Sequence, residues 1–294
     1  MEMNKVQWVI DNYMLEKHDE GIGFPRIDDV VKQLGHQLFL TKYVPFSDIP
    51  DFDFNLLDHT KPVVIYGSIQ FAQQIERFEI LRNKGIIPGL YFKKDALRFS
   101  HCAAYYGELM MNENFIMLPY GELKRRIICD MEGRQPPYFS SHEIFIRPDV
   151  VTKSFAGRFF DFSSLQDNIY ELYRYQKIDD YELCVIANPC TIIGEYRHII
   201  CDKEIIAQSQ YRYDNKTDIR IDVDPDCQAL VKEILRKDYE VDNIYVVDTA
   251  MTLDGPRIVE FNSFSCSGLY ASNTVNIVKL VSESACKEFY EEML

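Results

Sequence analysis

The segment Asp248-Thr-Ala-Met-Thr-Leu-Asp-Gly-Pro-Arg-Ile-Val-Glu260-Phe-Asn262 predicts two β-strands joined by a tight turn. Its flanks are rich in β-branched and aromatic residues, which suit a pleated strand. Asp254-Gly255 between them favours a hairpin, since glycine accepts the positive φ that such turns need. Side chains alternate between the two faces of a strand, so Glu260 and Asn262 point the same way and Phe261 points into a core.

The same hairpin predicts a metal site, because antiparallel pairing places Asp248 beside Glu260 and Asn262. Two carboxylates and an amide oxygen suit Mg²⁺, which takes few protein ligands and leaves its other positions to water and phosphate oxygens. The spacing alone leaves a second interpretation about equally open, in which the hairpin is exposed and its polar face is merely solvated.

Composition limits the class of protein. With 294 residues and 47% hydrophobic content, the chain is long enough for two compact units or one large α/β domain. It has no apolar run near the ~20 residues that span a bilayer and no signal-peptide pattern, so we expect a cytoplasmic protein. A net charge of -14 opposes non-specific binding to nucleic acid or anionic membranes. The eight cysteines have no Cys-x-x-Cys or metal-ligand spacing, which indicates free thiols.

The first third of the chain alternates between strands and helices, a pattern that predicts a parallel sheet with right-handed crossovers. Gly67-Ser68, at one strand-to-helix junction, favours a plain turn and helix cap, because the glycine-rich dinucleotide fingerprint is absent. We expect strands at residues 5–10, 37–43, 62–66 and 86–92, and helices at 27–34 and 70–83.

The rest of the chain mixes helices with longer strands. We expect helices at residues 96–111, 119–129, 165–177, 225–239 and 272–293, and strands at 115–118, 143–148, 181–186, 191–200, 204–213, 244–248 and 257–261, with another strand that ends at Phe162.

Several cationic side chains follow or interrupt these strands. Arg147 at a strand end and Lys153 in the next loop suit phosphate, the first by bidentate contact and the second as a mobile point charge, although pairing with surface carboxylates is the ordinary alternative. Glu195 and Arg197 share one face of a strand, and Arg212 on the partner strand is expected near Arg197. Two adjacent arginines repel unless an anion or a carboxylate lies between them, which favours an anionic ligand without requiring one.

These motifs, in this order, resemble the ATP-grasp enzymes, and in particular the clade in which an arginine stands where most members carry the ATP-binding lysine, called the arginine-for-lysine clade below. The resemblance covers roughly residues 86–275. Its strongest part is the Asp248, Glu260-x-Asn262 arrangement with the following Ser263–Tyr270 loop. Phe-Ile-Arg147-Pro148 is similar to the strand that ends in Lys-Pro, the 153–157 segment to the phosphate loop, and Glu195-Tyr-Arg197 to the hairpin beyond the adenine-binding hinge.

The resemblance implies an α/β protein with the ATP-grasp fold, in which two α+β lobes hold ATP between them after a small Rossmann-like βαβ domain. It divides the chain into a pre-ATP-grasp domain at residues 1–92, lobe A at 93–180 and lobe B with the metal site at 181–294.

The resemblance also implies a role for each candidate residue. Asp248, Glu260 and Asn262 would hold Mg²⁺, with Mn²⁺ as an alternative, while Arg147 and Lys153 would contact the phosphates of ATP. Glu195 would contact the ribose or the hinge side, and Arg197 and Arg212 would act on the acyl phosphate or the acceptor carboxylate. The adenine hinge would come from Cys184, Val185, Ile186 and Ala187.

The sequence departs from the family pattern in two places. The 153–157 loop is poor in glycine, and the lysine that usually approaches from the preceding domain has no clear counterpart, with Lys93, Lys94 and Lys124 as candidates.

The function implied is an ATP- and Mg²⁺-dependent carboxylate–amine ligase that forms ADP through an acyl phosphate. Its partners would be small-molecule or peptide carboxylates and amines, and neither nucleic acid nor membrane is expected. No covalent nucleophile is needed, so Cys266 is not expected to act as one. A kinase or phosphotransferase on the same fold and a catalytically silent nucleotide-binding module are the alternatives, and the retained metal triad argues against the silent module.

Overall fold

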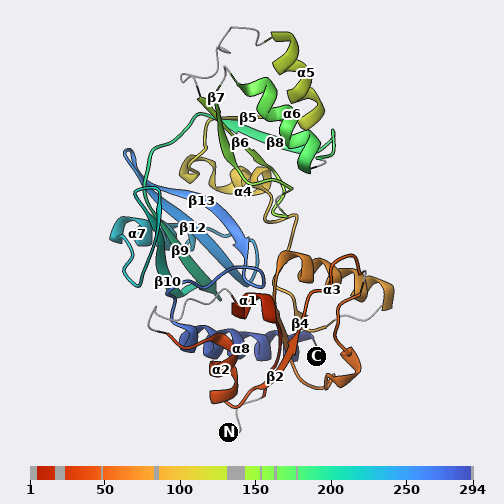
Figure 1. The fold of residues 1–294 in the computed structure, drawn as a ribbon. Helices are drawn as coiled ribbons and strands as arrows, with labels where there is room; N and C mark the ends of the chain where they lie inside the picture. Colours follow the sequence, from red (N-terminus) through yellow and green to blue (C-terminus); the bar gives the residue numbers. More distant parts are fainter. Residues whose placement is uncertain are drawn as a thin grey trace.

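The computed structural model describes residues 5–16, 24–47, 49–82, 86–130, 143–152, 154–161, 164–176 and 178–292. Three sheets follow one another along the chain and are stacked from the bottom to the top of Figure 1 in the order first, third, second. Mixed α/β architecture with several sheets confirms the predicted fold class. None of the helices in the described ranges is long and apolar enough to cross a membrane.

The N-terminal sheet is parallel and has the strand order β2-β1-β3-β4, which confirms the predicted βαβ arrangement. Trp8 and Ile10 pack in a core with residues of α2 and α8, whereas Val9 and Ile65 pack with residues of α3. Burial on both faces explains why these strands read as continuous apolar runs. The elements are β1 (Gln7–Asp11), α1 (Asn12–Glu16), α2 (Ile27–Gln33), β2 (Gln37–Thr41), η1 (Phe54–Leu56), β3 (Val63–Tyr66), α3 (Ile69–Arg82) and β4 (Pro88–Gly89).

The last strand of this sheet is much shorter than the predicted 86–92. Gly89 has a φ of 73°, which lies outside the extended region and ends the strand. The strand order reverses between β1 and β3, because the chain moves outward to β2 from one of them and to β4 from the other. The carboxyl ends of these two strands therefore border a crevice.

The second sheet is antiparallel, with the order β5-β8-β6-β7, and carries α5 and α6 (Figure 1). The predicted 96–111 helix is shorter, because the chain tightens to a 3-10 turn from Gly107. The elements are α4 (Phe99–Tyr106), η2 (Gly107–Leu109), β5 (Phe115–Pro119), α5 (Tyr120–Asp130), β6 (Glu143–Pro148), β7 (Arg158–Asp161), α6 (Leu165–Gln176) and β8 (Leu183–Ala187).

The third sheet is antiparallel and has the order β11-β10-β9-β12-β13. Its edge strand β11 was not predicted, although Asp214 and Asn215, with φ of 48° and 58°, form the positive-φ turn that commonly joins two strands. The elements are β9 (Ile192–Cys201), β10 (Glu204–Tyr213), β11 (Lys216–Arg220), α7 (Pro225–Ile234), β12 (Ile244–Thr252), β13 (Gly255–Ser263) and α8 (Thr274–Glu292).

Helix α8 ties the N-terminal sheet to the third sheet, as Figure 1 shows. One hydrophobic core contains Trp8 from β1, Ile199 from β9 and Val278 from α8, and Trp8 Nε1 donates a hydrogen bond to Ser282 Oγ at 3.0 Å. Strand β8 belongs to the second sheet, although the predicted boundary after residue 180 assigns it to lobe B. The three-domain division stays a prediction, and the sheets favour a second boundary after β8.

Candidate functional site

The β12–β13 hairpin brings together the three residues predicted to bind metal. Asp248 pairs with Glu260 in the strand register, and Asn262 Nδ2 donates to Asp248 Oδ2 and to Glu260 Oε1, both at 3.0 Å. The turn differs slightly from the prediction. Thr252 pairs with Gly255, so the turn residues are Leu253 and Asp254, and Gly255, with a φ of 100°, begins the returning strand.

The donor set at this hairpin fits a hard cation. The Asn262 amide nitrogen occupies a position between two carboxylates, and rotation of the amide would place its oxygen there instead. Within the described residues, no three His, Cys, Asp or Glu side chains gather as metal ligands, so a cation here has to use Asn262 beside the two carboxylates. Two carboxylates and one amide oxygen suit Mg²⁺.

Arg147 links the second sheet to this hairpin. It lies near the end of β6, and its guanidinium donates to Glu260 Oε2 at 2.9 Å and to the Val259 carbonyl at 3.3 Å. The guanidinium carbon also lies 5.5 Å from the centre of the Phe99 ring. Both charged side chains are largely buried, so water screens the attraction between them only weakly.

Arg197 forms a buried ion pair with Asp248. Its Nε and Nη2 donate to the two Asp248 oxygens at 2.8 and 2.6 Å, and its Nη1 donates to the Gly268 carbonyl at 2.8 Å. The guanidinium carbon lies 4.9 Å from the Tyr270 ring centre and 5.7 Å from that of Tyr211. Burial works against the charged form, but the charge and hydrogen bonds of Asp248 outweigh it and raise the pKa of Arg197.

The strand register shows which carboxylate Arg212 contacts. Ser209 stands opposite Arg197, and Arg212 stands opposite Glu195, two residues from Arg197 along β9; the bulge in β10 between residues 210 and 212 sets this second pairing. Arg212 Nη1 donates to Glu195 Oε1 at 3.1 Å. Each arginine therefore has its own carboxylate, and no ligand anion is needed to separate them.

Glu195 and Asp248 are joined through a residue that sequence reasoning missed. Tyr211 Oη donates to Glu195 Oε2 at 2.7 Å while its ring faces Arg197. Burial, then the charges of Asp248 and Glu195, raise the pKa of Tyr211, so its hydroxyl remains a donor. The result is one connected network, which we call the arginine–carboxylate network: Arg147, Glu195, Arg197, Tyr211, Arg212, Asp248, Glu260 and Asn262.

The predicted adenine hinge lies mostly inside a sheet. Cys184, Val185 and Ile186 are buried in β8 and pair with β5 on one side and β6 on the other. Their backbone groups are thus engaged by neighbouring strands, and the strand ends at Ala187. Backbone groups that are not engaged by neighbouring strands begin after Ala187, and the adenine hinge stays a prediction.

The predicted phosphate loop is described only in part, since Lys153 lies outside the described residues. Gly157 comes close to β6: a Cβ there would stand 2.7 Å from Phe145 Cζ and 3.2 Å from Arg147 Cβ. A small residue at this position therefore lets the loop approach Arg147.

The three lysine candidates from the preceding region each contact a carboxylate. Lys93 pairs with Asp242 at 2.9 Å, Lys94 pairs with Glu76 at 2.7 Å, and Lys124 pairs with Asp180. None of these carboxylates belongs to the arginine–carboxylate network.

The loop after the metal-site hairpin is held by the N-terminal sheet. Gly67 N donates to the Ser265 carbonyl at 2.8 Å, and Tyr66 Oη donates to the Ser267 carbonyl at 2.7 Å. Cys266 lies in this loop, and burial raises the pKa of its thiol to about 12. A thiol that resists ionisation is a poor nucleophile, which agrees with the expectation for Cys266.

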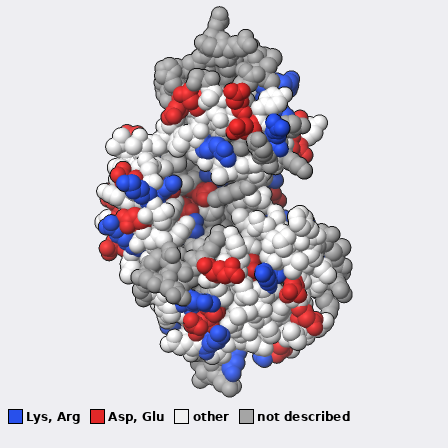
Figure 2. Space-filling view, viewed as in Figure 1, with Lys and Arg blue, Asp and Glu red and all other residues white. Residues whose placement is uncertain are grey.

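The surface is hollowed between the second sheet and the rest of the molecule, and Figure 2 shows both acidic and basic side chains in this hollow. The Arg147–Glu260 pair joins β6 and β13 across the two sheets.

A sequence model of the ATP-grasp domain, family 2 of the arginine-for-lysine clade, matches residues 123–280, more than half of the chain. The chain belongs to this family. The match confirms the predicted resemblance to this clade of ATP-grasp proteins. It also contains the whole arginine–carboxylate network, from Arg147 to Asn262.

Solved structures share the ATP-grasp fold with this chain. D-cycloserine synthetase DcsG is 11% identical with a TM-score of 0.57, covering 95% of this chain and 99% of that one. D-alanine--D-alanine ligase from Bacillus anthracis with ATP is 10% identical with a TM-score of 0.57, covering 98% and 99%. ATP-grasp ligase PsnB with a precursor variant, Mg and ADP is 12% identical with a TM-score of 0.54, covering 98% and 100%. No curated protein matches the chain.

Proposed function

We propose that this ATP-grasp protein is an ATP- and Mg²⁺-dependent carboxylate–amine ligase that forms ADP through an acyl phosphate. The observation that carries the proposal is the position of Asn262 between the Asp248 and Glu260 carboxylates, with Arg147 and Arg197 beside them. The similar solved structures are named as a synthetase and ligases, which supports ligation over phosphotransfer. The expected substrates are amino acids, peptides or a protein terminus.

The charge of the arginine–carboxylate network supports a metal–triphosphate ligand. Its three arginines balance its three carboxylates, so the network by itself offers no surplus positive charge to a phosphate chain. A divalent cation held by Asp248, Glu260 and Asn262 would leave the network positive. When bound, Mg²⁺, or Mn²⁺ as the alternative, neutralises phosphate oxygens as negative charge develops on them.

The residues of the network divide into two roles. Arg147 reaches the hairpin from the other sheet and is proposed to contact phosphate oxygens together with Lys153. Arg197 uses three nitrogens on Asp248 and Gly268, so we assign it a positioning role that fixes the Asp248 carboxylate and the following loop. Arg212 and Glu195 extend that support through Tyr211.

The proposed reaction has two steps. A substrate carboxylate oxygen attacks the γ-phosphorus of ATP, the bond to the β-phosphate oxygen breaks, and ADP leaves. The amine nitrogen then attacks the carbonyl carbon of the acyl phosphate, phosphate leaves, and the nitrogen loses a proton. Buried cations and exclusion of water favour both steps, and no protein nucleophile is used.

The test is product analysis with a labelled carboxylate. The protein is incubated with ATP, Mg²⁺ and pooled amino acids and dipeptides whose carboxyl groups carry ¹⁸O. We expect a condensation product, ADP, and phosphate that contains one ¹⁸O, because the attacking oxygen ends on phosphorus. A phosphorylated product without condensation would replace the ligase by a kinase.

Glu260→Gln tests the metal assignment, with Asp254→Asn in the exposed turn of the same hairpin as the matched control. We expect Glu260→Gln to lower Mg²⁺-dependent turnover by about 10²-fold, as loss of metal-site groups typically does. Asp254→Asn should keep parental turnover. Equal turnover in both variants would remove Glu260 from the metal site.

A further inference from the structure

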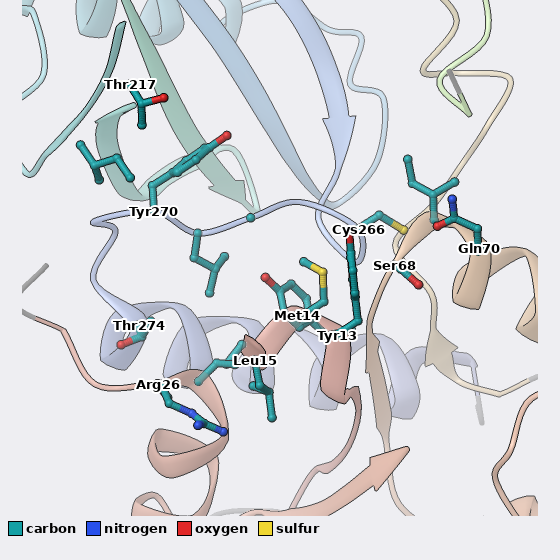
Figure 3. Close-up of a pocket in the computed structure, with 16 residues that line it drawn as sticks. Tyr13, Met14, Leu15, Arg26, Ser68, Gln70, Thr217, Cys266, Tyr270 and Thr274 are labelled. Atoms are coloured by element: carbon teal, nitrogen blue, oxygen red, sulfur yellow. The ribbon is translucent and has the colours of Figure 1, made fainter. Parts of the chain in front are cut away.

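A cavity of 540 Å³ lies between the N-terminal sheet and the third sheet. Figure 3 shows that its wall comes from five segments: α1 with Tyr13 and Met14, the start of α2 with Arg26, the β3–α3 junction with Ser68, the loop before α8 with Cys266 and Tyr270, and edge strand β11 with Thr217. Its volume is in the range of about 300–1,000 Å³ that is usual for small-molecule sites.

The cavity wall is continuous with the arginine–carboxylate network. Gly268 lines the cavity, and its carbonyl accepts the hydrogen bond from Arg197 Nη1 at 2.8 Å. Tyr270 also lines the cavity, and its ring lies 4.9 Å from the Arg197 guanidinium carbon. One side chain, Arg197, therefore separates this wall from the Asp248 carboxylate. A substrate that reaches the metal-site hairpin from this side has part of its structure in the cavity.

The described residues of the lining offer no uncompensated charge to a ligand. Arg26 is the single charged residue among the sixteen lining residues that the structure describes, and it donates to both Asp28 oxygens at 3.0 and 3.1 Å. A charged side chain placed here would lose its hydration without gaining a partner of opposite charge.

Several polar groups of the wall are already engaged by the protein. Ser68 Oγ donates to Asp11 at 2.8 Å, Tyr66 Oη donates to the Ser267 carbonyl at 2.7 Å, and Thr274 Oγ1 donates to the Pro25 carbonyl at 2.8 Å. What remains toward the space is apolar and aromatic surface together with uncharged polar side chains such as Gln70 and Thr217. The contributing aliphatic residues are Met14, Leu15, Ile27, Ile69, Ile219 and Leu269.

We propose that this cavity binds a large uncharged side chain of the ligase substrate, aliphatic or aromatic, and excludes acidic and basic side chains. The substrate class is therefore an amino acid or peptide that carries a residue such as leucine, methionine or phenylalanine. This inference rests on the proposed ligase function, but it makes a separate prediction about side-chain charge.

The experiment compares matched substrates with the intact protein, ATP and Mg²⁺. ADP release and condensation are measured for the free amino acids Leu, Phe, Glu and Lys and for the dipeptides Ala-Leu, Ala-Phe, Ala-Glu and Ala-Lys, with alanine as the common amine acceptor. We expect kcat/KM to be at least about tenfold higher for the uncharged members, since pocket discrimination of apolar groups reaches about 10–200-fold. Comparison of the two sets identifies a free amino acid or a peptide as the source of the side chain.

A positive charge introduced into the wall should shift this preference toward acidic side chains. Ile219 lines the cavity from edge strand β11, where a polar substitution disturbs little packing. We expect Ile219→Lys to raise the Glu-to-Leu ratio of kcat/KM by at least about tenfold, because a tenfold change needs only a modest charge–charge gain. Ile221→Lys is the matched control, since Ile221 is 56% exposed and does not line the cavity. The control should keep the parental ratio.

The outcomes separate this inference from the ligase proposal. Condensation that is equally efficient with charged and uncharged side chains, or better with charged ones, overturns the cavity assignment and leaves the ligase intact. Absence of condensation with every substrate overturns the ligase. In that case calorimetric binding of Ala-Leu and Ala-Glu in the presence of a non-hydrolysable ATP analogue and Mg²⁺ still decides the cavity, because equal binding of the two, or none, contradicts it.

Discussion

Two arginine–carboxylate pairs stand side by side in this protein and are built differently. Arg197 and Asp248 belong to neighbouring strands of one sheet, share two hydrogen bonds, and are packed against Tyr211 and Tyr270. Arg147 and Glu260 belong to two different sheets and share one hydrogen bond of 2.9 Å. The first pair is fixed by the strand register, whereas the second depends on how the two sheets approach each other. We therefore expect the first pair to support stability and the second to respond to ligands.

The largest expected effect on stability comes from the pair within the sheet. Arg197→Ala leaves the buried Asp248 carboxylate without its ion-pair partner, which should lower the free energy of unfolding by about 3–5 kcal/mol. Urea unfolding followed by tryptophan fluorescence measures the change. Arg197→Lys, which keeps the charge but not the bidentate geometry, should recover part of it. A loss smaller than about 1 kcal/mol, well below the usual ~3 kcal/mol, would contradict the structural role.

The pair between the sheets should show the opposite profile. Arg147→Ala should lower the rate of ATP turnover by about 10²–10³-fold, because a preorganised donor for developing phosphate charge is lost. Its effect on the free energy of unfolding should be much smaller than that of Arg197→Ala, since Glu260 keeps its hydrogen bond from Asn262. Steady-state ADP release and urea unfolding of the two variants provide the comparison. Parental ATP affinity and turnover in Arg147→Ala would exclude a phosphate role.

The opposite face of β9 should make stability depend on pH. His198 follows Arg197, is fully buried, and its Nε2 lies 2.9 Å from Thr249 Oγ1. Burial lowers the pKa of His198 to about 4 from an ordinary value of 6.5. The unfolded chain therefore binds a proton first as pH falls, so stability is lost between about pH 6.5 and pH 4, by up to about 3 kcal/mol. Above that window this residue contributes no pH dependence.

His198→Asn should remove the part of the pH dependence that arises from this residue, whereas His59→Asn, at an exposed position, should leave it unchanged. Thermal unfolding across the same pH window in the parent and both variants measures the difference. An unchanged slope in His198→Asn would show that carboxylates alone produce the acid sensitivity.

The smallest expected effect on stability concerns the rim of the network. Arg212 pairs with Glu195, but its side chain is 50% exposed. Its replacement by alanine should cost less than about 1 kcal/mol, as for other solvent-screened pairs. Glu195 retains its hydrogen bond from Tyr211, so the carboxylate is not left without a donor. A loss comparable to that of Arg197→Ala would place Arg212 among the buried supports of Asp248.

Local rules account for the features that were predicted well. The side-chain period of a strand placed Glu260 and Asn262 on one face, and the hairpin turn placed Asp248 beside them. Alternating strands and helices likewise predicted the parallel N-terminal sheet. These features depend on residues that are near one another along the chain, where the geometry of a strand or turn leaves few alternatives.

Long-range strand order accounts for the contacts that the sequence did not indicate. Strand β12 lies beside β9, which brings Asp248 to Arg197 across a sequence separation of 51 residues, a pairing that no local pattern indicates. Arg212 stands opposite Glu195 only because of the bulge in β10, without which the register would place it opposite Gly194. The pairing of β8 with both β5 and β6, which engages the backbone of the predicted hinge, is likewise a property of the assembled sheet. The missed edge strand β11 is the exception, since the Asp214-Asn215 turn was a local signal.

The amino-acid sequence was sufficient to predict the family, the β12–β13 hairpin and the grouping of Asp248, Glu260 and Asn262 on it. Tertiary structure was needed to show that Arg197 pairs with Asp248 and that Tyr211 links Glu195 to Arg197. It was also needed to show that the cavity wall carries no uncompensated charge among its described residues. The physical reason is that strand periodicity and turn conformation are set within a few residues. The partner of a buried charge, by contrast, is set by which distant strands pack together.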